Sequence, residues 1–221
     1  MGRIFGIDSG FYRFMNKVAD LIILNLLCLI CCIPIVTIGA SVTAMYTVML
    51  RIVRNEESYT VRGFFNAFKD NFRQSTIIWL IYAAAGCLLW FDMWFCKQMD
   101  HPVLNVLWYV FLFLSFVYLM MVLYVFPIQS RFVNTIKNTI KNSLIMAIAQ
   151  LPWTVLIILC HAAVFILIYV QPGWFFYILA YLLLMGISLP AFGSSYIFNR
   201  VFKKFMPKEE EEEDIKELPE E

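Results

Sequence analysis

Residues 18–53 read VADLIILNLLCLICCIPIVTIGASVTAMYTVMLRIV, an almost uncharged run that decides the fold of this chain. Crossing about 30 Å of hydrocarbon takes roughly 20 apolar helical residues, so two short crossings fit within the run. Pro34 ends a helix because it lacks an N–H and clashes with the preceding turn, and Gly39 permits a reversal. We therefore expect a tight hairpin of helices 18–34 and 36–53. The run itself leaves two alternatives open, a single long span and a re-entrant element.

The second arm of this hairpin opens with small residues at helical spacing. Gly39 and Thr43 form one pair four residues apart, and Ala40 and Ala44 form another. Small residues at this spacing allow the backbones of two helices to approach closely. The pattern predicts a close helix contact at this point.

The rest of the chain has the same apolar character. Of 221 residues, 62% are apolar and only 15% are charged, whereas a soluble domain is about 45–50% apolar and about 25% charged. This composition excludes a soluble enzyme, a disordered protein and a nucleic-acid binder, and it makes the lipid bilayer the first expected partner. Further apolar runs cover residues 75–96, 103–128, 144–170 and 174–198. The predicted fold is an all-α membrane helix bundle with six spans arranged as three hairpins.

Loop charge indicates the orientation of these spans. Lys and Arg accumulate in cytoplasmic loops. A six-span arrangement with both termini inside places 16 of the 17 basic residues on one side and leaves only Lys97 on the other. A five-span arrangement destroys this asymmetry. The charge pattern therefore predicts a multi-pass protein with cytoplasmic N- and C-termini.

The basic segments that precede the hairpins are amphipathic. Phe11–Lys17, Val61–Gln74 and Phe132–Ser143 each combine aromatic or aliphatic residues on one face with basic and amide residues on the other. Helices of this kind lie in the membrane interface, so we expect three interfacial lead-in helices. Residues 1–206 then form the transmembrane domain. Residues 207–221, which hold nine of the sixteen acidic residues, are predicted to be a disordered cytoplasmic tail.

Few polar residues lie inside the predicted spans, and each is a candidate functional residue because burial in hydrocarbon is costly. His161 is the most interior titratable residue, and it is a candidate for proton relay, for substrate contact or for a neutral hydrogen bond between helices. Asp92 and Asp20 lie near opposite ends of their spans. Asn25 is a buried amide, a type that more often links helices than binds a ligand.

Helix-breaking residues form a second set of candidates. Interrupted helices mark the substrate sites of many transporters, but they can also shape a bundle without binding anything. The candidate hinges are Pro34, Gly39, Pro127 and Pro190.

The sequence contains no pattern that indicates catalysis. We find no G-x-x-x-x-G-K-[ST] nucleotide loop and no H-E-x-x-H zinc motif. The six cysteines lie in apolar runs and lack the spaced Cys and His pairs of a zinc site. We therefore predict a non-enzymatic protein with no cofactor and no metal site.

Several stretches together resemble the YesL-like family of bacterial integral membrane proteins, and the resemblance spans essentially the whole chain. It is most specific in the first 75 residues. The stretches that carry it are FG at 5–6, FYRFMNKVAD at 11–20, NLL at 25–27, PIVTIGAS at 34–41, the segment from Gly63 to Phe72, and the end from Pro190 to Asn199-Arg200. The family is a domain of unknown function without established binding residues, and its genes commonly lie beside those of carbohydrate ABC importers. The resemblance implies a plasma-membrane protein associated with sugar uptake.

Two functions follow as hypotheses. The first is an accessory component of a carbohydrate ABC importer, which would contact the permease or ATPase subunits. The alternative is an independent small-solute transporter or channel that uses His161 and the interrupted helices. The chain lacks the E-A-A-x-x-x-D-G signature of importer permeases, so we do not expect it to be the translocation subunit itself.

Overall fold

The computed structural model describes residues 10–56, 59–98, 101–170 and 175–203, and every regular element in these ranges is helical. The prediction of an all-α fold is therefore confirmed for this part of the chain. In order, the elements are α1 (Gly10–Cys32), the short 3-10 helix η1 (Ile35–Thr37), α2 (Ile38–Val53), α3 (Thr60–Gln98), α4 (Pro102–Arg131), α5 (Ile136–Ala149), α6 (Leu151–Val170), α7 (Phe175–Leu184) and α8 (Ser188–Lys203).

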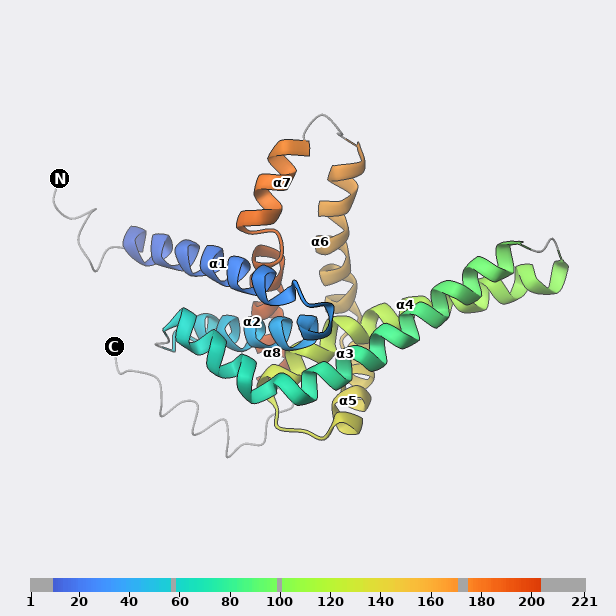
Figure 1. The fold of residues 1–221 in the computed structure, drawn as a ribbon, viewed down its shortest axis with the longest axis horizontal. Coiled ribbons are helices and arrows are strands. Elements are labelled where there is room, and N and C mark those ends of the chain that lie inside the picture. The colour runs from blue at the N-terminus through green and yellow to red at the C-terminus, as the bar shows by residue number, and fades with distance from the viewer. Residues whose placement is uncertain (1–9, 57–58, 99–100, 171–174, 204–221) are drawn as a thin grey trace.

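The first four α-helices run roughly along one direction, and α6 and α7 stand across it (Figure 1). Helices α3 and α4 form a long hairpin whose far end projects away from the other helices (Figure 1). The core lies where α2 is enclosed by α1, α3, α4 and α8. Tyr124, Phe64, Phe198 and Phe202 are among its largest fully buried side chains.

The chain reverses between α1 and α2 through residues 33–37, which excludes a single long span. Helix α1 ends at Cys32, just before Pro34, as the sequence predicts, and Pro34 directly precedes η1. Thr37 closes the end of α1 because its hydroxyl donates hydrogen bonds to the carbonyl oxygens of Cys31 at 2.6 Å and Pro34 at 2.7 Å. From α3, the indole N–H of Trp79 donates to the carbonyl oxygen of Ile35 at 2.8 Å.

The expected role of Gly39 in this reversal needs correction. Gly39 lies after the turn, inside α2, and no glycine in the described residues has a positive φ. A Cβ atom at this position would lie 2.6 Å from the Cβ of Trp79 and still closer to the carbonyl oxygen of Ser75. Gly39 therefore allows α2 and α3 to pack closely. Ala40, Thr43 and Ala44 are also buried, which confirms the predicted close helix contact.

The three predicted lead-in segments do not all form separate helices. Val61–Gln74 is not a separate helix, because α3 continues without interruption for 39 residues from Thr60 to Gln98. No proline and only the isolated Gly63 and Gly86 occur in this length, so the helix propagates through the junction. Phe11–Lys17 likewise forms the first part of α1. Only the third segment, Phe132–Ser143, leads into a separate helix, which is α5 (Ile136–Ala149).

The predicted span 144–170 is also not one straight helix. Helices α5 and α6 meet at Gln150 with a bend of 93°. Pro152 lies in the first turn of α6, where its missing N–H costs little. Thr154 stabilises the bend because its hydroxyl donates to the carbonyl oxygens of Ala147 and Gln150, both at 3.0 Å.

The predicted span 174–198 is divided as well. Helix α7 ends at Leu184 and α8 begins at Ser188. Pro190 lies in the first turn of α8, which is the helical position that tolerates proline best. Pro127 behaves differently, since it is buried inside α4 and the helix continues past it to Arg131. Of these two prolines, only Pro190 adjoins an interruption.

Within the described ranges, four segments are long and apolar enough to cross a bilayer, namely Phe14–Cys32, Ile35–Val53, Thr60–Gln98 and Pro102–Arg131. The bent pair of α5 and α6 adds a fifth if it is counted as one span. The count of six spans and the cytoplasmic position of both termini stay predictions. The acidic segment 207–221 lies outside the described residues.

Two glycine-to-alanine substitutions, one in α2 and one in α8, test the packing of α2 against α3. We expect Gly39→Ala to lower the free energy of unfolding by about 1–3 kcal/mol, the typical cost of overpacking. The control is Gly193→Ala in α8, because nothing lies within 4 Å of a Cβ atom at that position. Without a clash, alanine stabilises a helix interior by about 0.5–1 kcal/mol relative to glycine. Thermal unfolding in detergent measures both effects, and equal effects would contradict the packing role.

Candidate functional site

Asn25 in α1 is the most completely hydrogen-bonded polar residue among the sequence candidates. Its side chain is fully buried. The amide N–H groups donate to the carbonyl oxygens of Leu182 at 3.1 Å and Leu183 at 2.8 Å, at the end of α7. The amide oxygen accepts from the backbone N–H groups of Ile187 at 2.9 Å and Ser188 at 3.1 Å, at the start of α8. One side chain thus satisfies both sides of the α7–α8 interruption.

This arrangement defines the chemistry of the interruption. A helix break leaves backbone donors and acceptors unpaired, and in hydrocarbon each one is costly. Asparagine fits here because its amide offers donors and an acceptor at one position. All of these groups are used within the protein. Asn25 is therefore an interhelical link, the more common of the two roles considered for a buried amide.

The other predicted polar residues do not converge with Asn25. Asp20 accepts a hydrogen bond from the Thr60 hydroxyl at 2.6 Å, which ties α1 to the first residue of α3. Asp92 is half-buried in the second half of α3. His161 belongs to α6, but its side chain lies outside the described part of the structure.

A second polar cluster joins α3, α4 and α5, and sequence analysis missed it. The Gln74 amide donates to the amide oxygen of Gln129 at 3.1 Å and to the carbonyl oxygen of Asn134 at 2.6 Å. The hydroxyl of Thr139 donates to the same Gln129 oxygen at 3.2 Å. Gln129 and Thr139 are buried. In the sequence, the cluster is visible only as a glutamine near the end of an apolar run. This pattern is weak evidence for a polar cluster because the sequence does not show which residues the glutamine contacts.

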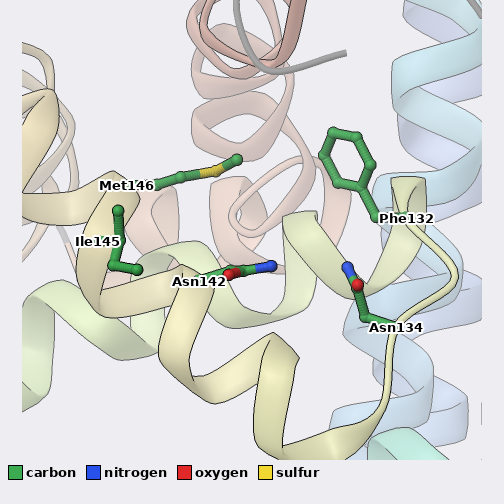
Figure 2. Close-up of a pocket in the computed structure, with 5 residues that line it drawn as sticks. All are labelled: Phe132, Asn134, Asn142, Ile145 and Met146. Carbon is green, nitrogen blue, oxygen red and sulfur yellow. The ribbon is translucent and has the colours of Figure 1, made fainter. Parts of the chain in front are cut away.

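This cluster supports one wall of a pocket of about 280 Å³. The α4–α5 connection supplies one side of the pocket, and α5 supplies the other (Figure 2). Figure 2 shows Asn142 and Met146 projecting from α5 toward the connection that holds Phe132 and Asn134. The lining residues are Phe132, Asn134, Asn142, Ile145 and Met146. We refer to this cavity as the α4–α5 pocket.

Exposed basic residues lie on the three helices around this pocket. Contacts between Gln74 and Asn134, and between the rings of Phe132 and Phe202 at 5.3 Å, bring the helices together. We call the exposed basic residues of these three contacting helices the basic face: Lys69 and Arg73 of α3, Lys137 and Lys141 of α5, and Arg200 and Lys203 of α8. Arg200 also lies over the ring of Trp153 at 5.8 Å. Among the described residues, no group of three His, Cys, Asp or Glu side chains is arranged to hold a metal ion.

The fold and these polar contacts define a class: an α-helical protein with several candidate membrane spans, four or five of them in the part of the chain that the structure describes, whose interrupted helices are linked by buried side chains. Comparison with known proteins identifies similar sequences. The family described as "Protein of unknown function, DUF624" matches residues 21–93. The chain is 32% identical over 154 residues to the uncharacterized protein YesL of Bacillus subtilis (strain 168), covering 68% of this chain and 72% of that protein.

A second relative from the same organism supports this assignment. The chain is 24% identical over 131 residues to the uncharacterized protein YteU, which covers 59% of each chain. No solved structure matches. The chain belongs to the YesL-like family.

The Asn25 link gives a direct prediction about stability. We expect Asn25→Leu to lower the free energy of unfolding by about 2 kcal/mol, because it removes four hydrogen bonds that average about 0.6 kcal/mol each in membrane proteins. The control is Asn66→Leu on an exposed position of α3, where substitutions change stability by less than about 0.5 kcal/mol. Thermal or denaturant unfolding in detergent measures both. If the two variants unfold alike, Asn25 does not stabilise the α7–α8 interruption.

Proposed function

We propose that this protein is a non-enzymatic accessory component of a bacterial plasma-membrane transport complex. In this proposal it contacts the permease or ATPase subunits of a carbohydrate ABC importer. The observation that supports docking is the basic face, in which helices α3, α5 and α8 carry exposed cations and α3 and α8 both contact the α4–α5 connection. The carbohydrate assignment comes from the resemblance to the YesL-like family.

The basic face also supports the proposed orientation. Basic residues favour the cytoplasmic side of a membrane, and that side is where an importer ATPase is accessible. A basic surface attracts acidic partner surfaces and discriminates against basic ones. The proposal therefore places the α4–α5 pocket, the basic face and both termini on the cytoplasmic side of the membrane.

An independent transporter or channel is the second candidate, and the interrupted helices favour it. Transporters use the unpaired backbone groups of such helices to bind substrates and ions. At the α7–α8 interruption, however, Asn25 occupies two carbonyl oxygens and two N–H groups. Because these backbone groups are already hydrogen-bonded to Asn25, they do not form a substrate site. The accessory function therefore has the stronger support.

Labelling tests the proposed orientation. In a cysteine-free background, Arg62→Cys lies at the start of α3 and Gln98→Cys lies at its end, and both positions are exposed. An impermeant maleimide should label Gln98→Cys in intact cells and should label Arg62→Cys only after permeabilisation. The opposite pattern would place the basic face outside the cell.

Affinity purification tests the accessory role. From native membranes extracted in mild detergent, the tagged full chain should recover permease or ATPase subunits of a carbohydrate ABC importer. Charge reversal by Lys69→Glu and Arg73→Glu should reduce this recovery about tenfold, because like charges across an interface are strongly unfavourable.

The matched control is Lys97→Glu, at the other end of α3, which should leave recovery unchanged. If the wild-type chain recovers no importer subunit, the accessory role is wrong. Substrate flux through proteoliposomes that contain this chain alone, altered by His161→Ala, would support the transporter instead.

A further inference from the structure

The α4–α5 pocket has a polar part and an apolar part. Asn134 and Asn142 direct their side-chain amides into it (Figure 2). Neither of these two amides hydrogen-bonds another side chain or backbone group within the described part of the chain. Phe132, Ile145 and Met146 form the remainder of the lining. The pocket therefore offers hydrogen-bond donors beside an apolar surface.

The charged residues of the α4–α5 connection and of α5 are all basic. Lys137 and Lys141 occupy exposed positions of α5, and Lys141 directly precedes Asn142. Residues 131–150 contain no Asp or Glu. On α3, Asp70 is exposed among Lys69 and Arg73, so the basic residues also outnumber the acidic ones there. This surplus favours an anionic ligand.

The surroundings of the pocket also include exposed apolar side chains. Val133 is fully exposed at 107%, and Ile145 and Ile148 are exposed at 47% and 54%. A small soluble anion would leave these side chains and the apolar lining in contact with water. A lipid at the membrane interface covers apolar surface with its acyl chains and presents its phosphate to the amides and lysines.

The pocket wall is held in place before any ligand binds. The backbone carbonyl of Asn134 is fixed by the amide of Gln74, which is itself bound to the buried Gln129. Because this bond uses the backbone, the Asn134 side chain stays available. A preorganised wall reduces the entropy lost on binding.

We propose that the α4–α5 pocket binds the head group of an anionic phospholipid. The amides of Asn134 and Asn142 donate to phosphate oxygens, and Lys137 and Lys141 supply the preference for net negative charge. The acyl chains lie along Phe132, Ile145 and the neighbouring exposed apolar residues. Basic pockets on one side of a helical membrane protein are a known setting for anionic head groups. This inference does not depend on the importer partnership proposed above.

Lipid titration of the purified full-length chain, followed by native mass spectrometry, tests the proposal. Wild-type protein should bind phosphatidylglycerol about thirtyfold more tightly than phosphatidylcholine, since both carry phosphate but only the first has net charge, and two lysines each contribute about 1 kcal/mol. Asn142→Leu should weaken binding of both lipids about tenfold, because it removes a hydrogen bond to a charged group. Asn138→Leu, an exposed position on α5 outside the pocket lining, is the matched control and should change neither affinity.

A second variant separates charge from hydrogen bonding. Lys141→Gln should reduce the preference for phosphatidylglycerol about fivefold, whereas Lys97→Gln, an exposed position at the far end of α3, should leave the preference unchanged. Lys141 is exposed, so this variant keeps the test valid if Asn142→Leu fails to fold. Melting temperatures measured in lipid-free detergent establish that each variant is folded.

Three results would overturn the proposal. Equal wild-type affinity for the two lipids would remove the anionic preference. Wild-type affinities in both Asn142→Leu and Lys141→Gln would place lipid binding elsewhere. Displacement of phosphatidylglycerol by millimolar inorganic phosphate would identify the ligand as a free anion instead of a lipid.

Discussion

The fold depends on one constraint, which is that backbone N–H and C=O groups must find partners where water is scarce. The chain interrupts its apolar helices at three places in the described residues, and a polar side chain adjoins each interruption. Thr37 closes α1, Thr154 binds two carbonyl oxygens at the α5–α6 bend, and Asn25 binds both sides of the α7–α8 break. The side chains of these three residues hydrogen-bond backbone groups that have no helical partner at the interruptions. The bends are therefore specific features of the fold.

Local signals in the sequence predicted much of the helical structure. The reversal near Pro34 and the small residues of α2 follow from steric rules that act within a few residues. The same rules misjudged Gly39, because a glycine that permits a turn and a glycine that permits close packing look identical in one sequence. The 93° bend at Gln150 was missed because residues 144–170 form one continuous apolar run.

Long-range polar contacts set the limit of sequence analysis at the candidate site. Asn25 was identified as a buried amide, but its partners lie 157 or more residues away and could not be read from its neighbours. Gln74 and Gln129 were passed over because a single amide near a helix end is typical of a solvated surface. Only their mutual contact, and the contact of Gln74 with the Asn134 backbone, distinguishes them. The sequence indicated a function only through its resemblance to a family, because no residue pattern in it specifies a reaction.

The uninterrupted length of α3 has a mechanical consequence. At 1.5 Å per residue, its 39 residues extend about 58 Å, nearly twice the roughly 30 Å of hydrocarbon in a bilayer. At ordinary tilt angles, a substantial part of this helix must project beyond the apolar layer. The helix bends along its length (Figure 1), but no break in it separates the two parts. Its projecting part and its apolar part therefore belong to one continuous backbone, with no loop between them.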